Sequence, residues 1–215
     1  MSSPISPRLM KGGIVTLEPN TGIPLGTIAL QYNPDTLTRK LQPQAVSEQP
    51  DRSEILRLKG PPIETISVAA EIDATDQLAA SDATALTVGI QPQLAALEML
   101  VYPSSVDLIV NEALTLLGTI EILPMESPLA VFVWNATRIT PVRITSLDIT
   151  EEAFDTNLNP IRAKVSLEMR VLNVNDTGFL NPAGALYMIY QIEKEALAIT
   201  NAVQAAGGLA ASVLP

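Results

Sequence analysis

Apolar and polar residues alternate along two segments of the chain, residues 64–73 and residues 161–171. Two residues is the side-chain period of a β-strand, so each segment is predicted to be a strand with one buried face. The predicted buried faces consist of Ile66, Val68, Ala70 and Ile72 in the first segment and of Ile161, Ala163, Val165, Leu167, Met169 and Val171 in the second. On the opposite face of the second segment lie Arg162, Lys164 and Arg170.

Other apolar segments predict further strands. Residues 14–17 and 27–32 flank a region rich in proline and glycine, which predicts a hairpin. Residues 129–134 form an unbroken apolar run, as expected for a strand that is covered on both faces. Strands are also expected at residues 106–110 and 114–123.

One predicted strand changes its apolar face partway along. Val142 and Ile144 share one face, whereas Leu147 and Ile149 fall on the other. A β-bulge near Thr145–Ser146 adds one residue to the strand and returns these side chains to a common face.

Two segments are predicted to be helical. Pro92 suits the first turn of a helix, and the apolar residues of 94–101 give that helix a broad buried face. Near the end of the chain, Asn181 suits the cap of a second helix with Pro182 at its first position. Gly207–Gly208 is expected to end that helix.

The C-terminal helix carries apolar residues at alternating spacings of four and three. They are Ala185, Ile189, Ile192, Ala196, Ile199, Val203 and Ala206. This seven-residue period has two interpretations, a coiled coil or a helix that lies on its own domain. Both interpretations require an apolar surface to cover the stripe.

The predicted elements define a mainly β (α+β) fold, an antiparallel two-sheet sandwich or small barrel with one central helix and a C-terminal helix. Residues 1–12 are expected to be a flexible arm, residues 13–175 a β domain and residues 176–215 a helical tail. Residues 38–63 contain five basic residues and four prolines, and they are interpreted as an extended loop or a projecting hairpin.

The composition indicates burial between subunits. Apolar residues make up 47% of the 215 residues and charged residues 17%, below the roughly 25% of an average soluble chain. An outer surface covered by other subunits accounts for this balance, and a stable monomer with few surface charges is the alternative.

The net charge of −10 is concentrated in one third of the chain. Between Gly60 and Thr137 there are ten acids and no Lys or Arg, while the remaining 13 acids balance the 13 basic residues. The negative electrostatic field of these acids argues against nucleic acid as a partner. It is suited to steering a basic partner or lining an acidic channel, and a solvated acidic face is the alternative.

Candidate catalytic and metal-binding groups are few. The chain has no His and no Cys, which removes the commonest general base, thiolate ligands and disulfides. The carboxylate pairs Glu151–Glu152 and Glu71/Asp73 are interpreted as surface charges, so we expect neither an enzyme nor a cofactor or metal site. With no signal-peptide pattern and no run of about 18 apolar residues, the cytoplasm is the expected compartment.

Three segments carry a recognisable order of motifs. The first is the turn Tyr32–Asn33–Pro34, and the second is the apolar strand that ends at Trp134. The third runs from Phe154 to Pro160–Ile161–Arg162–Ala163. Together these segments resemble the tube-protein domain of contractile injection systems, the phage-tail-like particles of bacteria. The family pattern has a Gly in the turn of the third segment, and this chain does not. Asn157 and Asn159 stand nearby, and asparagine tolerates the left-handed backbone conformation that glycine adopts in such a turn.

The resemblance covers residues 13–172 and implies a structural role. It implies a hexameric ring that joins the inner tube to the baseplate hub and spike, with the inner tube, hub/spike and baseplate or sheath proteins as partners, in a phage-tail-like particle. Family members often carry a C-terminal LysM module, which this chain lacks. The chain is therefore expected to be either the adaptor ring with a reduced tail or another tube-initiating ring.

The expected contacts between subunits follow from this resemblance and from the apolar stripe. They are Arg39, Lys40, Arg57, Ile189, Ile192, Ile199 and Val203. The basic residues of the strand at 161–171 are likewise expected to pair with acids of a neighbouring chain.

A binding module is the alternative function. A monomeric β-sandwich that binds a carbohydrate or peptide has the same fold class, but such modules usually expose aromatic residues on one face. This chain contains one Trp, four Tyr and three Phe.

Overall fold

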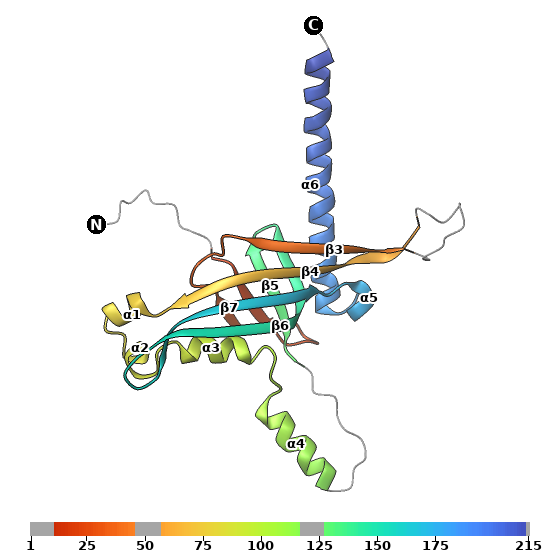
Figure 1. Cartoon of the computed structure of the whole chain (residues 1–215). Coiled ribbons are helices and arrows are strands. Elements are labelled where there is room, and N and C mark those ends of the chain that lie inside the picture. Colours follow the sequence, from red (N-terminus) through yellow and green to blue (C-terminus); the bar gives the residue numbers. More distant parts are fainter. Residues whose placement is uncertain (1–10, 46–56, 117–126, 214–215) are drawn as a thin grey trace.

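The strands form one open antiparallel sheet. In the computed structural model, residues 11–45, 57–116 and 127–213 are described, with side chains up to residue 205. Within these residues, seven strands pair in the order β2-β1-β5-β6-β7-β4-β3 (Figure 1). They are β1 (Gly13–Leu17), β2 (Pro24–Ala29), β3 (Leu37–Ala45), β4 (Leu58–Asp73), β5 (Leu129–Asn135), β6 (Arg138–Phe154) and β7 (Pro160–Val171). The expected mainly β, antiparallel α+β class is confirmed, and the sheet does not close.

β6 joins the two halves of this sheet. Its first residues pair with β5 as far as Val142, and from Val142 onward it pairs with β7. The register shifts between Ile144 and Ser146, which confirms the expected bulge and its reason, a change of apolar face. Since one long strand serves both halves, the strands belong to a single sheet rather than to two separate ones.

The alternating segments supply the centre of the core, as predicted. β4 and β7 lie side by side, with Ile66 opposite Met169 and Val68 opposite Leu167. These four side chains are at most 3% exposed, while Glu71 and Lys164, opposite each other on the outer face, are exposed. The apolar run of β5 is buried over its first four residues, as expected for a strand covered on both faces.

The chain passes from one edge of the sheet to the other through residues 30–36. The side-chain amide of Gln31, just after β2, accepts a hydrogen bond of 2.9 Å from the backbone N–H of Asp73, at the end of β4, and donates one to the Asp73 carbonyl. The backbone N–H of Leu30 donates to the carbonyl of Gly12. These bonds tie the segment after one edge strand to the strand beside the other edge, so the sheet curls around its core.

Three short helices follow β4. They are α1 (Thr75–Ala79), α2 (Ala83–Val88) and α3 (Gln91–Glu98). The Asp82 side chain caps α2 by accepting hydrogen bonds from two backbone N–H groups of its first turn. Pro92 stands in the first turn of α3 as predicted, and Leu94 and Leu97 bury one face of this helix in the core.

The prediction of a strand at residues 106–110 is wrong, because this segment is helical. It belongs to α4 (Ser105–Leu116), which begins where Ser104 and Asp107 hydrogen-bond each other and the Asp107 N–H donates to the Ser104 hydroxyl. The second expected strand covers residues 114–123. Its residues 114–116 also lie in this helix, and its residues 117–123 are outside the described part of the chain. Short apolar runs fit either period, so the cap decided the structure here.

The C-terminal elements begin at capping residues. Asn173 and Asp176 form a capping box at α5 (Val174–Thr177). Asn181 accepts a hydrogen bond of 2.9 Å from the N–H of Ala183 at the start of α6 (Pro182–Val213), as predicted. The predicted end at Gly207–Gly208 is wrong, since the helix continues to Val213; glycine in a helix interior costs only about 1 kcal/mol relative to alanine.

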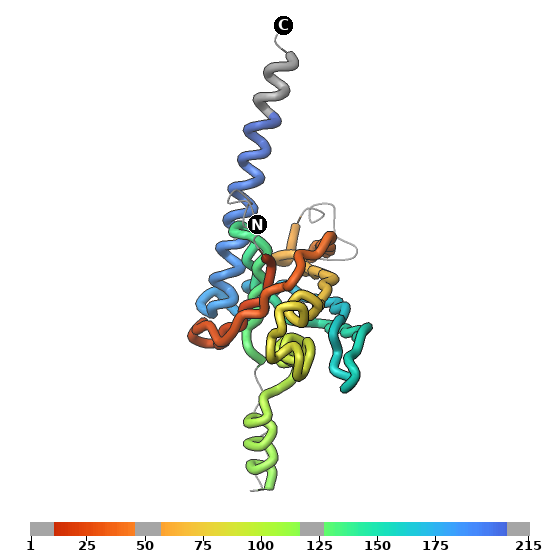
Figure 2. The backbone as a smooth tube through the Cα atoms, turned by 90° about the vertical axis from the view of Figure 1, so that its left-hand side faces the viewer, coloured from red at the N-terminus to blue at the C-terminus, as the bar shows by residue number. Residues whose placement is uncertain are grey.

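The two long helical elements extend away from the sheet. Figures 1 and 2 show α6 projecting beyond the sheet on one side and α4 extending on the opposite side. Among the described residues, no helix combines the length and apolar character required to cross a membrane.

Candidate assembly interface

The two edge strands of the sheet carry exposed apolar side chains. On and beside β2, Ile23 and Leu25 are 60% and 59% exposed, and on β3 Leu41 is 49% exposed. Among the described strands, β2 and β3 each have one neighbour, so one side of each backbone has no strand partner. Pro43 interrupts the register of β3 with β4, which leaves Leu37–Gln42 as the regular part of that edge. An edge strand of this kind is a template for pairing with another chain.

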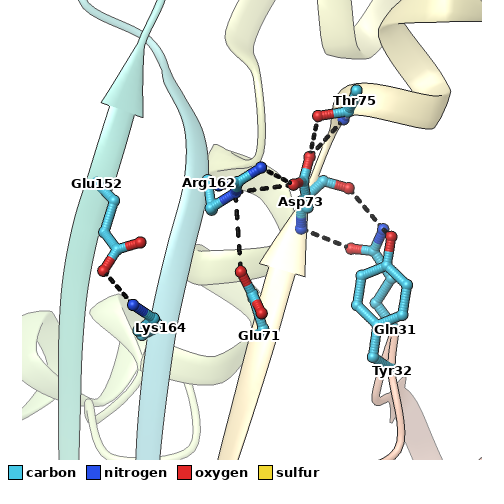
Figure 3. Close-up of polar contacts among 8 residues, drawn as sticks. All are labelled: Gln31, Tyr32, Glu71, Asp73, Thr75, Glu152, Arg162 and Lys164. Carbon is cyan, nitrogen blue, oxygen red and sulfur yellow. Dashed lines mark hydrogen bonds and ion pairs between the residues drawn. The ribbon is translucent and has the colours of Figure 1, made fainter.

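The basic stripe of β7 is paired inside the chain (Figure 3). The Arg162 guanidinium lies 2.7 Å from the carboxylate of Asp73 and 3.7 Å from that of Glu71, and Lys164 Nζ lies 2.6 Å from Glu152. The expectation that these residues pair with a neighbouring chain is wrong. For Arg162 and Lys164 the reason is the register, which sets β7 between the acids of β4 and β6. Arg170, the third residue of the stripe, lies 2.7 Å from Asp176 of α5.

Asp73 is the centre of the polar contacts in Figure 3. Hydrogen bonds from the Thr75 hydroxyl and backbone N–H, together with the Arg162 guanidinium, hold the pKa of the Asp73 carboxyl below its usual value. The same pairing raises the pKa of Arg162. Arg162, one of the residues of the sequence motif, thus fixes the ends of β4 and β7 relative to each other.

The first two motif segments lie close together in the structure. The Asn33 side chain accepts a hydrogen bond of 3.1 Å from the N–H of Gly12, at the start of β1. Trp134, on β5, is half-buried against the same glycine, where a Cβ atom would lie 3.2 Å from the indole ring. The Trp134 ring also lies 6.0 Å from the Phe132 ring, centroid to centroid, while Tyr32 is 46% exposed.

The third motif segment forms the turn between β6 and β7. Its left-handed residue is Leu158, with φ of 64°, rather than Asn157 or Asn159. The backbone N–H groups of both asparagines donate to the Asp155 carboxylate, and the Asn159 amide also donates to the carbonyl of Thr87 at 3.1 Å. The Asn159 side chain therefore stabilises this turn by hydrogen bonding. Phe154, at the end of β6, is 49% exposed.

This turn is held against the junction of α2 and α3. The N–H of Ile90 donates to the carbonyl of Pro160 at 2.9 Å. Gly89 adopts φ of 60°, and a Cβ at this position would lie 2.1 Å from the same carbonyl. A glycine is therefore required where this backbone approaches the motif turn.

A buried carboxylate that the sequence interpretation missed connects the sheet to α6. Glu64 on β4 is 3% exposed. Its Oε1 accepts hydrogen bonds from Arg39 Nε on β3 at 2.7 Å and from the Tyr190 hydroxyl on α6 at 3.2 Å, and Lys194 Nζ lies 3.4 Å from Oε2. We call these four residues the Glu64 cluster.

The surroundings of the Glu64 cluster shift two pKa values. Burial, with Glu64 close by, raises the pKa of Tyr190 to about 12. Burial lowers the pKa of Lys194, against the opposing effect of Glu64. A signal for this cluster exists in the sequence, since Glu64 has the same parity as Ile66, on the buried face of the strand.

The remaining expected contact residues fall into two groups. Lys40 on edge strand β3 and Arg57, just before β4, are exposed, whereas Arg39 is held in the Glu64 cluster. The four apolar contact residues lie on α6 and are between 55% and 67% exposed. They are Ile189, Ile192, Ile199 and Val203.

α4 presents a second exposed apolar surface. None of its residues is buried, and Val106, Ile109 and Leu116 are 65%, 69% and 79% exposed. An isolated helix of about 12 residues is marginal in water. Together with the edge strands and α6, this helix gives the described part of the chain apolar surface on several sides, as the low content of charged residues predicts.

Comparison with known proteins adds little. No family model and no curated protein matches the sequence. Among solved structures, a chain from the tail of an empty GTA particle with C6 symmetry aligns at 16% sequence identity, over 75% of this chain and 90% of that chain, with a TM-score of 0.30. A TM-score of this size does not establish a shared fold.

Proposed function

We propose that this protein is a structural subunit of a contractile injection system, and that its copies form a ring joining the inner tube to the baseplate hub and spike. The observation that carries the proposal is the pair of edge strands, β2 and β3, which lie at opposite margins of one sheet and each have one neighbour among the described strands. The order of the three sequence motifs, which resembles that of tube proteins, supports the same role.

In the proposed ring, β2 of one copy pairs with β3 of the next. The two edges are different surfaces, so the contact is head-to-tail, and such a contact closes into a ring when its rotation permits. Strand pairing also buries the exposed apolar side chains of Leu25 and Leu41, which a monomer leaves in water. The resemblance to tube proteins favours a hexamer.

Two projecting elements are suited to contact neighbouring rings. Strands β3 and β4 pair antiparallel as far as Ala45 and Leu58, with Lys40 and Arg57 exposed, as a hairpin at residues 38–63 requires. Residues 46–56 of that expected hairpin lie outside the described residues. α4 extends from the sheet (Figure 1), and its apolar side chains are exposed. We assign the partners of these elements to the inner tube and the hub, in an adaptor ring or a tube-initiating ring.

The proposed role is not enzymatic. Of the carboxylates that lie close together in the sequence, Glu71 and Asp73 face Arg162 and Glu152 faces Lys164. These pairs connect adjacent strands, so their role in this proposal is to hold the sheet.

The test is assembly. The full chain, expressed alone and together with any tube and hub proteins that its neighbouring genes encode, is examined by negative-stain electron microscopy and by light scattering. Rings that cap tube ends support the proposal. A chain that stays monomeric under both conditions contradicts it, and saturable binding of a carbohydrate or peptide by that monomer would favour a binding module.

A further inference from the structure

The apolar stripe of α6 is exposed along its whole described length. Ala185 and Ala196 are exposed, and Ile189, Ile192, Ile199 and Val203 are between 55% and 67% exposed. The stripe begins in the first turn of the helix, where α6 is still in contact with the sheet. Ala206 lies beyond the described side chains. The interpretation that this stripe covers its own domain is therefore wrong.

A different face of α6 packs on the domain. Ala183, Tyr187 and Tyr190 are at most 5% exposed, and Lys194 reaches Glu64 from the same face. Each of these residues precedes a stripe residue by two positions, which is a rotation of about 200° around a helix. The Glu64 cluster fixes this rotation, so the domain cannot turn the stripe toward itself.

The spacing of the stripe specifies a helix as its partner. Spacings of four and three put the stripe at positions a and d of a heptad abcdefg, with Ile189 and Val203 at a and Ile192 and Ile199 at d. A period of 3.5 residues, rather than 3.6, keeps one seam facing a second helix in a left-handed supercoil. The residues that pack on the domain are then at positions b and f, on the outside of the coil.

The charges beside the stripe fit a second copy in parallel orientation. Positions e and g contain two charged residues, Glu193 at e and Glu195 at g. In a parallel, in-register pair, position g faces position e of the following heptad on the other helix. Glu195 then faces Thr200 and Met188 faces Glu193, so no two glutamates oppose each other.

We propose that α6 is a self-association helix, whose stripe packs against the same stripe of another copy in a parallel, in-register coiled coil. The domains lie outside this coil, because they pack on positions b and f. This association does not depend on pairing of the edge strands, and it stands if the chain serves another particle or none.

Cysteine cross-linking tests the proposal directly, because the chain contains no Cys. Ile192→Cys and Ile199→Cys place one thiol at each of two d positions, and Leu197→Cys is the control at position b, where the side chain is 56% exposed. Under mild oxidation both d variants are expected to form covalent dimers, and the control is not. An antiparallel coil can cross-link at most one of the two d positions. Cross-linking at only one d position, or at neither, would therefore overturn the proposal, as would equal cross-linking of the control.

A charge substitution gives an independent test. In a chain whose edge pairing is blocked by Leu25→Asp, Ile199→Asp is expected to remove the concentration-dependent increase in mass that α6 gives, and Leu197→Asp is expected to retain it. Both positions are exposed in the isolated chain, at 65% and 56%, so neither substitution should lower the melting temperature. A mass that is unchanged in Ile199→Asp would overturn the proposal, while edge-strand variants examined in parallel report on the ring.

Discussion

Glu64 shows how single residues connect the two principal parts of the molecule. A buried carboxylate is costly unless it is paired, and here Arg39, Tyr190 and Lys194 satisfy it from β3 and α6. Replacing one partner leaves a buried charge without compensation, which costs about 3–5 kcal/mol in comparable pairs. The cluster thereby fixes the position of α6 against the sheet.

Tyr190→Phe is expected to reduce the loss of stability at alkaline pH. The folded pKa of Tyr190, about 12, lies above the value of 10 for an unperturbed tyrosine. The stability from the protonated hydroxyl is therefore fully present below pH 10 and is lost as the pH rises toward 12.

The measurement is the free energy of urea unfolding between about pH 9 and about pH 11.5. The wild type should lose more stability over this interval than Tyr190→Phe. Lys194 and Tyr187 are present in both proteins, so their contributions cancel in the comparison. Equal losses of stability in the two proteins would mean that the Tyr190 hydroxyl is exposed to water and that its pKa is not raised.

Phe132 and Trp134 are expected to differ in their contributions to stability. Phe132 is 1% exposed, and Phe132→Ala should lower the free energy of unfolding by about 3–5 kcal/mol. Trp134 is half-buried, so Trp134→Ala should cost less, about 1–2 kcal/mol, since less apolar area is lost. Chemical denaturation of the two variants measures both values, and a larger loss for Trp134→Ala would contradict this assignment.

At the scale of elements, α6 has two parts with different roles. Its beginning belongs to the core, since Ala183, Tyr187 and Tyr190 are buried against the sheet. Its later part, from Ala196 to Ala205, is exposed on all sides in the isolated chain. The first turns of the helical tail therefore pack on the β domain.

Two truncations separate these parts. Removing residues 196–215 should leave the melting temperature nearly unchanged, because the removed side chains described by the structure are exposed. Removing residues 181–215 also deletes Tyr187 and Tyr190 and exposes Glu64, so this chain should be strongly destabilised or unfolded. Circular dichroism on heating distinguishes them, and equal melting temperatures would contradict the packing of α6.

Local signals explain which elements could be predicted from the sequence. The alternation in β4 and β7, the bulge in β6 and the cap of α6 each depend on residues adjacent in the chain. The assignment of α4 failed because its short apolar run fits two periods, and its exposed surface offered no core to decide between them. Strand register brings Asp73 to Arg162 and Arg39 to Glu64 from positions distant in sequence, and the packing of α6 on the sheet brings Tyr190 and Lys194 to Glu64.

At the scale of the whole molecule, the sheet has two different edges, and both carry exposed apolar side chains. β2 and β3 end the sheet on opposite margins, and both carry exposed leucines. A monomer gains nothing from these features, whereas a head-to-tail ring uses both. The proposed role in a contractile injection system depends on this pairing.

The most direct measurement is the mass of mixed edge variants by light scattering. Leu25→Asp blocks β2 and Leu41→Asp blocks β3, and since both positions are exposed, each variant should remain folded. Residues 196–215 are removed from both variants, so that α6 cannot contribute to the mass. Each variant alone should be monomeric. Their mixture should form a dimer, because the intact β3 of the Leu25→Asp chain pairs with the intact β2 of the Leu41→Asp chain. The dimer should not grow further, since its two remaining edges are blocked. A mixture that stays monomeric, or a single variant that still assembles into rings, would contradict the account.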